Sequence, residues 1–498
     1  MEYHLLTYSL LFLPVVILLY QLTPAKLRWL FLLIVDYVFF FLISKGLIIF
    51  LFVATLATYG TGRWLAYVTE HATVKGKALT KKKRMVLATG ITITLGMLIV
   101  FKYLRVFGIA TTLVAPIGIS YYTLQTISYM TDVYRGTVKA ERNLAKVALY
   151  LSFFPQIMEG PISRFSETAE ALFAGKGIEY KNLVFGYQRI LWGLFKKMMV
   201  ADRLAPVVYK VFSKPEACDG AEVAVGAVCF TLQLYTEFSG CMDIIMGSGE
   251  IFGITLPENF RQPFFAENAS DFWRRWHITL GTWLKDYVFY PISLAKPVKN
   301  IAKKVKKGFG INVSKFVAPT IALFFVWLSN GIWHGAGWTY LFYGMYYFVL
   351  IFLENITEAP LKQWIEKRNL HTDRFGWKIL RGIKLFIIVN IGEMFFRASS
   401  VSQGFAMLKN ICLNFHVRSL DVTGLGTDHY EILVVMMAIL IVFVVDVLHE
   451  KGISIRERIA SYHMPVRWCV WYALILCIVI LGAYGAGYTF VDMIYAAY

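Results

Sequence analysis

The sequence predicts an all-α, polytopic membrane protein, and its composition is the first reason. Apolar residues make up 57% of the 498 residues, and charged residues make up only 16%. A soluble domain averages ~45–50% apolar residues with glycine counted and ~25% charged residues, so a soluble fold of this size would lack the polar surface to cover its apolar side chains. Composition therefore excludes an ordinary soluble enzyme, a disordered chain and a disulfide scaffold.

The length of the apolar runs is the second reason. A helix that crosses a bilayer needs ~20 mostly apolar residues. The runs predicted to span the membrane are 4–20, 28–44, 46–62, 85–101, 108–130, 221–239, 316–334, 336–355, 380–398, 430–449 and 468–490. We therefore expect about 11 spanning helices in a single membrane domain over residues 1–498.

The middle of the chain departs from this simple pattern. Segments 145–163, 181–202 and 241–293 mix aromatic residues with Arg, Lys, Asp, Pro and Gly. Irregular backbone at membrane depth is tolerated only where protein or a water-filled cavity surrounds it. These segments are predicted to be re-entrant or interfacial helices, and we expect the working site among them.

Runs of basic residues predict the orientation. Cytoplasmic loops of membrane proteins collect Lys and Arg, which face anionic headgroups. The net charge of +18 is therefore expected to serve contacts with membrane lipids and not with nucleic acid. Four basic runs, at 75–84, 296–307, 362–381 and 451–467, are predicted to be cytoplasmic. This arrangement places the N-terminus, residues 399–429 and the C-terminus outside a cell membrane.

His334 is the first candidate for chemistry, because it ends an apolar run and is followed by Gly335. An ionisable residue at membrane depth is costly and by default indicates a functional site. A neutral imidazole can accept a proton near pH 7, as a general base must. Glycine lets a ligand approach the backbone closely, and Trp333 offers a rigid wall. The structural alternative is a histidine that hydrogen bonds to nearby backbone or to Asn330.

His277 is the second candidate, in a segment dense in aromatic and charged side chains. On a helix, Trp273, Trp276 and His277 would share one face. Two interpretations stay open. The segment is an amphipathic helix at the membrane surface, or it is the lip of a tunnel in which Arg274 and Arg275 hold an anionic donor such as a phosphate.

Two carboxylates, Glu237 and Asp243, lie in an apolar stretch. Such carboxylates are paired, hydrogen-bonded or protonated, and the basic residues expected as partners are Arg261 and the pair at 274–275. Their spacing turns them to different faces of a helix, so we favour structural charges over a catalytic pair. No metal site is predicted, because the 6 cysteines form no CxxC pair and no HExxH occurs. No bound cofactor is expected.

Taken together, several segments resemble the membrane-bound O-acyltransferase family. The closest likeness is to its bacterial branch around alginate O-acetyltransferase, which is related to the D-alanyl transfer protein of teichoic acid synthesis. The segments occur in the family's order at 116–125, 132–136, 153–156, 159–162, 237–243, 257–260, 272–277 and 333–335. Alginate-type members usually have Asp and Tyr where this chain has Glu237 and Cys241, and this difference leaves the acceptor open.

The resemblance implies a tunnel-containing catalytic core over residues 110–345, with His334 as the catalytic histidine and His277 as its supporting histidine. It also implies that an acyl thioester, either acetyl-CoA or an acylated carrier, enters from the cytoplasm and that a hydroxyl acceptor approaches from outside. Family systems add a secreted or membrane-anchored acyltransferase as partner. The residues expected to contact substrates are Arg274, Arg275, Trp276, Trp333, Asn330, Glu237 and Asp243.

The leading hypothesis is O-acyl transfer, and specifically O-acetyl transfer, to an extracytoplasmic cell-envelope polysaccharide or a partner protein. D-alanyl transfer to teichoic acid is the alternative in the same family, and the Gly-Trp-Thr at 337–339 resembles the acetyl-transferring branch more closely. A glycan or lipid transporter or flippase is the alternative from another class, since discontinuous spans and buried charges also occur there. A structural scaffold is a third alternative.

Overall fold

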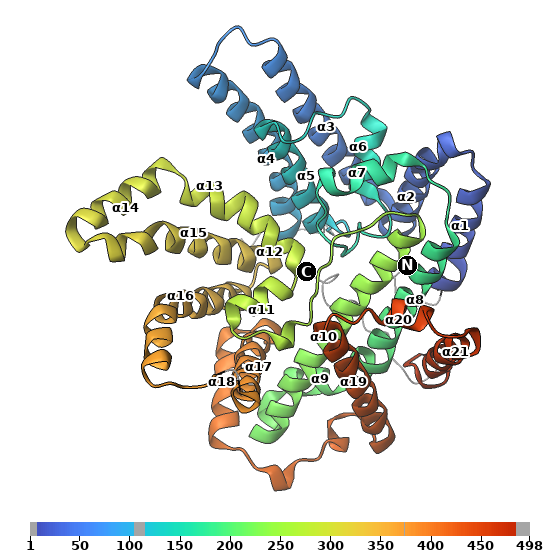
Figure 1. The fold of residues 1–498 in the computed structure, drawn as a ribbon, viewed down its shortest axis with the longest axis vertical. Coiled ribbons are helices and arrows are strands. Elements are labelled where there is room, and N and C mark those ends of the chain that lie inside the picture. Colours follow the sequence, from blue (N-terminus) through green and yellow to red (C-terminus); the bar gives the residue numbers. More distant parts are fainter. Residues whose placement is uncertain (1–6, 104–114, 373, 485–498) are drawn as a thin grey trace. The chain divides into compact units, whose positions relative to one another are not determined.

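A computed structural model describes residues 7–103, 115–372 and 374–484 of the chain (Figure 1). The regular structure of these residues is helical, and an isolated antiparallel bridge joins Phe260 to Trp276. The all-α fold predicted from composition and apolar runs is therefore confirmed.

The described residues fall into two compact units. The first comprises residues 7–103, 115–195 and 238–258, and the second comprises residues 196–237, 259–372 and 374–484. Helix α10 (Gly220–Ile251) contributes to both units, because the boundary falls between residues 237 and 238. The single membrane domain over the whole chain stays a prediction.

The first unit is built from the N-terminal helices and the last part of α10. Its elements are η1 (Tyr8–Phe12), α1 (Leu13–Leu22), η2 (Ala25–Leu27), α2 (Arg28–Ser44), η3 (Lys45–Leu47), α3 (Ile48–Glu70), α4 (Lys77–Tyr103), α5 (Ile119–Arg135), α6 (Leu144–Ser152), α7 (Phe165–Ala174) and nearly all of α8 (Tyr180–Lys196). Helices α3, α4 and α5 pack against one another, as Figure 1 shows.

Helix α5 is the core helix of this unit. Every residue from Ile119 to Met130 is buried, which agrees with its position against α3 and α4. The predicted span 108–130 ends within this helix, and residues 108–114 of that span lie outside the described residues. Buried polar groups of α5 are satisfied by distant segments: the Gln125 amide donates to Ser163 Oγ (3.2 Å), and Ser163 Oγ donates to Gln156 Oε1 (3.1 Å). Two of the family-like segments, 116–125 and 153–156, are thereby joined.

The second unit holds most of the chain after residue 195. Its elements are η5 (Lys197–Ala201), α9 (Asp202–Ser213), η6 (Pro215–Ala217), the first part of α10, η7 (Pro263–Phe265), α11 (Ala269–Arg275), α12 (Ile278–Leu284), η8 (Lys285–Phe289), α13 (Tyr290–Ser293), α14 (Lys296–Phe309), α15 (Ile311–His334), α16 (Trp338–Lys367), α17 (Phe375–Arg397), α18 (Val401–Leu413), η9 (Val417–Ser419), η10 (Thr423–Leu425), α19 (His429–Glu450), α20 (Ile455–Ala460) and α21 (Met464–Leu481). Helices α14, α15 and α16 follow one another along the chain and pack in that order, as the left side of Figure 1 shows.

Six helical segments are long and apolar enough to cross a membrane: Ala25–Glu70, Lys77–Tyr103, Ile311–His334, Trp338–Lys367, His429–Glu450 and Met464–Leu481. They contain or overlap the predicted spans at 28–44, 46–62, 85–101, 316–334, 336–355, 430–449 and 468–490, of which residues 485–490 lie outside the described residues. The predicted spans at 4–20, 108–130, 221–239 and 380–398 lie at least partly on other helices. The total of about 11 spans therefore stays a prediction.

The basic run at 296–307 lies on a helix, α14, where a loop was expected. All 6 of its lysines are exposed, whereas Val298, Ala302 and Val305 are at least partly buried. Their spacing of four and three residues places these three apolar side chains on one face of the helix, and α14 packs against α15. An amphipathic pattern thus explains why so charged a segment folds.

Candidate functional site

His334 is the last residue of α15, and its side chain is enclosed by aromatic rings. The residue is 2% exposed, and its ring centroid lies 5.0 Å from Trp333, 5.3 Å from Phe396 and 6.0 Å from Tyr343. The aromatic setting predicted around His334 is therefore present, with Trp333 as part of it. Tyr343 and Phe396 were missed by sequence reasoning because they come from two other helices, α16 and α17, and only helix packing brings them to His334.

Gly335 does not have the role that the sequence suggested. We expected this glycine to leave room for a ligand, but a Cβ atom at Gly335 would lie 2.2 Å from Cε2 of Tyr340. The space beside the Gly335 backbone is thus filled by the protein's own ring. The glycine is needed because α16 folds back onto the end of α15 at this point.

Asn330 lies one helical turn before His334 and is 4% exposed. Within the described residues, its side-chain oxygen accepts no hydrogen bond. The structural alternative in which this oxygen accepts a hydrogen bond from His334 therefore finds no support. A substrate-contacting role for Asn330 stays a prediction.

His277 does not continue the helix on which it was expected. Helix α11 ends at Arg275, Trp276 has extended backbone angles (φ −108°, ψ 130°), and His277 has a left-handed conformation (φ 46°, ψ 50°). The prediction that Trp273, Trp276 and His277 share one face of a helix is therefore wrong. A positive φ in a non-glycine residue is a strained conformation that clusters at functional sites.

The reason for the break is a short strand-like contact with residues 259–261. Phe260 forms the antiparallel bridge with Trp276, and the Arg261 amide donates to the Arg275 carbonyl (2.9 Å). Backbone pairing of this kind requires extended geometry and ends the helix. His277 then starts the next helix, α12, from its N-cap position.

Asn259 holds His277 in place and was missed as a site residue. The residue is 0% exposed, and its Oδ1 lies 3.2 Å from His277 Nδ1. The same oxygen accepts hydrogen bonds from the backbone N–H of Thr279 (3.1 Å) and from its hydroxyl (2.9 Å). The only sequence signal was that Asn259 falls in the family-like segment 257–260.

The two histidines are brought together by one tryptophan. The Trp333 ring lies 5.7 Å from His277 and 5.0 Å from His334, measured between ring centroids. His277 is 1% exposed, and this burial lowers its pKa to about 3. His277 is therefore neutral throughout the physiological pH range and offers an uncharged imidazole.

The basic and aromatic residues before His277 have contacts of their own. Arg275 forms ion pairs with Asp271 (3.2 Å) and with Glu450 (2.8 Å). These contacts favour a structural role for Arg275, while Arg274 is exposed. Trp276 is 2% exposed and stacks near Phe272 at a ring distance of 5.4 Å. Substrate contacts by these three residues stay predictions.

Glu237 is a buried charge with a partner that the sequence did not suggest. Its Oε1 lies 3.4 Å from Lys197 Nζ, which also lies 2.5 Å from Asp202 Oδ1. The side chains of Lys197 and Glu237 are 0% and 3% exposed. The structure thus pairs Glu237 with a lysine from η5, whereas arginines at 261 or 274–275 were expected. Pairing allows two such charges to be buried.

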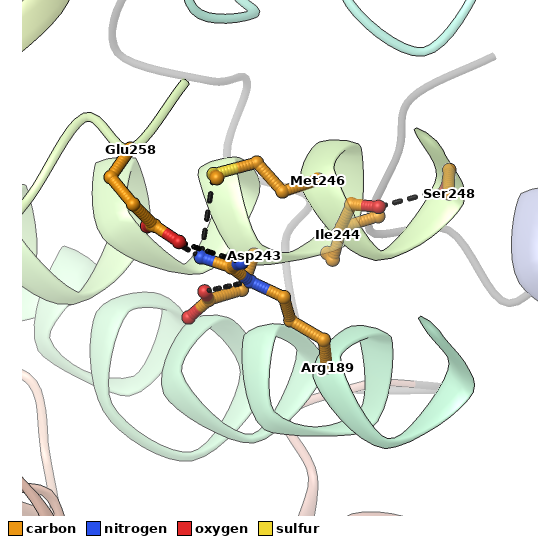
Figure 2. Close-up of polar contacts among 6 residues, drawn as sticks. All are labelled: Arg189, Asp243, Ile244, Met246, Ser248 and Glu258. Atoms are coloured by element: carbon orange, nitrogen blue, oxygen red, sulfur yellow. Dashed lines mark hydrogen bonds and ion pairs between the residues drawn. The ribbon is translucent and has the colours of Figure 1, made fainter. Parts of the chain in front are cut away.

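Asp243 belongs to the first unit, and Figure 2 shows its contacts. Arg189 on α8 donates from Nε to Asp243 (2.9 Å) and through Nη1 and Nη2 to the two oxygens of Glu258 (2.9 and 2.7 Å). Arg189 thus replaces the expected arginine partners. The two-bond contact with Glu258 matches the planar guanidinium to a carboxylate, an arrangement that lysine does not reproduce.

Comparison with known proteins identifies the family of the chain. Residues 139–399 match the model of the membrane-bound O-acyltransferase family. The chain is 31% identical to a probable alginate O-acetylase of Azotobacter vinelandii, over 80% of this chain and 75% of the relative. It is 30% identical to a peptidoglycan O-acetyltransferase of Helicobacter pylori, over 60% of this chain and 57% of the relative.

The name of a more distant relative indicates transfer of a different group. The chain is 28% identical to a teichoic acid D-alanyltransferase of Bacillus subtilis, over 51% of this chain and 62% of the relative. The family match covers the two aromatic-walled histidines as well as the ion-pair groups of Lys197 and Arg189. The chain is a membrane acyltransferase and belongs to the membrane-bound O-acyltransferase family.

Proposed function

We propose that this protein transfers an acetyl group from a cytoplasmic thioester to a hydroxyl of an extracytoplasmic cell-envelope polysaccharide or of a partner protein. The observation that carries the proposal is the pair of buried histidines, His277 and His334, whose rings both pack against the ring of Trp333. The higher identity and longer coverage of the alginate O-acetylase support acetyl transfer over D-alanyl transfer.

His334 is the general base of the proposed reaction. It takes the proton from the attacking hydroxyl while that oxygen bonds to the thioester carbon. The bond between the carbonyl carbon and sulfur then breaks, and the leaving thiolate takes the proton from the His334 imidazolium. The products are an ester and a free thiol. General-base assistance of this kind contributes typically ~10²–10⁴ in rate.

The aromatic enclosure supports this role for His334. Rings of Trp333, Tyr343 and Phe396 surround the imidazole and keep it 2% exposed. Exclusion of water limits hydrolysis of the thioester, which would waste the acyl group. It also strengthens the electrostatic interactions that stabilise the developing charge.

The exposed lysines of α14 are proposed to attract the donor. Six lysines lie on the exposed surface of this helix, and both coenzyme A and an acidic carrier protein are anionic donors. A surface of one charge raises the local concentration of oppositely charged ligands, and salt weakens the effect. The predicted cytoplasmic position of α14 agrees with donor entry from that side.

The choice between acetyl and D-alanyl donors is tested with purified protein in lipid vesicles without an ion gradient. Acetyl-CoA labelled in the acetyl group and a D-alanylated carrier protein are offered separately, with a hydroxylated glycan as acceptor. We expect ester formation from acetyl-CoA. Transfer from the D-alanylated carrier alone would overturn the acetyl assignment, and absence of ester with either donor would overturn acyl transfer between these substrates.

A further inference from the structure

The contact between Asn259 and His277 fixes which nitrogen of the histidine carries its proton. Asn259 Oδ1 accepts a hydrogen bond from the backbone N–H of Thr279, and a backbone N–H is always a donor. The atom of Asn259 at this position is therefore the oxygen and not the amide nitrogen. Since an oxygen only accepts, His277 Nδ1, at 3.2 Å, must be the donor.

The second ring nitrogen of His277, Nε2, carries no proton in this state. A neutral imidazole carries one proton, so a protonated Nδ1 leaves Nε2 with a lone pair. Burial keeps His277 neutral, because its pKa is lowered to about 3. An imidazole in this state accepts a hydrogen bond through Nε2, and it has no second N–H with which to stabilise an oxyanion.

The surrounding elements bear on the charge of His277. Helices α11, α12 and α15 lie around it, and α12 carries no titratable residue. Helix α11 carries Asp271, Arg274 and Arg275, of which Arg275 is ion-paired with Asp271. Other titratable groups on or beside these elements include Arg261, Lys285, Asp286, Lys315 and His334, and Glu354 and Glu450 contact α11. Asn259, the polar neighbour of His277 Nδ1, is uncharged at every pH.

We infer that Asn259 is a positioning residue that holds His277 with Nδ1 protonated, so that Nε2 accepts a hydrogen bond from a donor group of the substrate other than the attacking hydroxyl. Three features support this role: the three-way contact of Asn259 Oδ1, the left-handed backbone at His277, and the ring of Trp333, whose centroid lies 5.7 Å from His277 and 5.0 Å from His334. His277 then orients the substrate, and His334 removes the proton of the attacking hydroxyl. This second part rests on the proposed function.

The tautomer itself is tested by NMR on full-length protein labelled with ¹⁵N in its histidine rings. The signals of His277 are identified by their loss in His277→Gln. We expect a neutral ring with the proton on Nδ1, unchanged between about pH 6 and about pH 8. A proton on Nε2, or a charged ring in that range, would overturn the inference. This measurement requires no substrate, so it is independent of the proposed function.

The positioning role is tested by Asn259→Asp, which keeps the accepting oxygen and adds a negative charge beside His277. A carboxylate next to an imidazole favours the imidazolium, so the acid side of the rate profile should move to higher pH. The protonated ring has lost the lone pair of Nε2. Matched control Asn268→Asp makes the same chemical change at the N-cap of α11, where Asn268 accepts from Asp271 N–H.

We expect Asn259→Asp to lower the ratio of the rate at about pH 5.5 to the rate at about pH 8. Asn268→Asp should leave that ratio unchanged. Removal of the accepting oxygen in Asn259→Ala should lower kcat/KM by about 10–100-fold, the effect known for groups that orient metal-bound histidines. A ratio in Asn259→Asp equal to that of the wild type would overturn the positioning role, because a purely structural cap would survive this substitution.

Discussion

Lys197 illustrates how single residues hold charge inside this apolar protein. Its ammonium lies between Asp202 and Glu237, and its side chain is fully buried. Removing one partner of a buried ion pair costs about 3–5 kcal/mol, because the remaining charge stays buried. Each member of the network is therefore needed for the stability of the fold once the other members are present.

We expect Lys197→Met to destabilise the protein more than Glu237→Gln. The first change leaves the two carboxylates without the ammonium that they share, whereas the second leaves Lys197 next to Asp202 at 2.5 Å. The thermal unfolding midpoint in detergent is the measurement. Exposed Lys303 on α14 provides the control, since Lys303→Met should change the midpoint little. Equal midpoints for Lys197→Met and Lys303→Met would contradict the buried network.

At the scale of elements, helices α15 and α16 pack closely because glycines stand at their contact. A Cβ at Gly344 of α16 would lie 2.4 Å from the Trp327 carbonyl oxygen of α15. A Cβ at Gly335 would meet only the side chain of Tyr340, at 2.2 Å. The first overlap is with backbone and is relieved only if a helix moves, whereas the second is relieved if a ring is removed.

Gly335→Ala should lower the acyl-transfer rate and destabilise the protein by about 1–3 kcal/mol, the usual cost of overpacking. The double variant Gly335→Ala/Tyr340→Leu should recover much of the lost stability. Gly382→Ala is the matched control, because no atom lies within 4 Å of a Cβ at that position of α17. Unfolding midpoints and rates are measured on all three. If Gly335→Ala has the same unfolding midpoint and rate as Gly382→Ala, the ring of Tyr340 does not lie close to Gly335.

Helices were predicted better from the sequence than the contacts between separate segments. The apolar runs predicted helices well, because a helix with an apolar face or surface satisfies its own backbone wherever it lies. Phe260 and Trp276 were a different case: their backbone pairing ends α11, and pairing between residues 16 positions apart leaves no local pattern. His334 was found because an ionisable residue stands out in an apolar run. Its neighbours Tyr343 and Phe396 were not, since helix packing brings them there.

The predicted partners of the two carboxylates were wrong for a related reason. Arginines near in sequence were expected to pair with Glu237 and Asp243, but Lys197 and Arg189 are 40 and 54 residues away. Sequence composition required that the carboxylates have partners. Only the packing of helices decided which basic residues these were.

For the whole molecule, the basic runs predict a definite orientation in the membrane. Residues 399–429 are expected outside, and α14 is expected in the cytoplasm. Cys412 on α18 is exposed, so it is a natural probe of the outer side. In a variant with Cys412 as the sole cysteine, a membrane-impermeant maleimide should label intact cells. In a cysteine-free variant with Lys303→Cys, labelling should require opened membranes. The reverse pattern would contradict the orientation.

The central claim is that His334 is the base of an acyl transfer. The most direct measurement is the rate of labelled acetyl transfer to a hydroxyl acceptor by purified His334→Ala in lipid vesicles. We predict a loss of at least ~10²-fold in kcat with an unchanged unfolding midpoint, while His463→Ala, at an exposed position, keeps the full rate. A His334→Ala protein that transfers acetyl groups at the rate of the wild type would contradict the account.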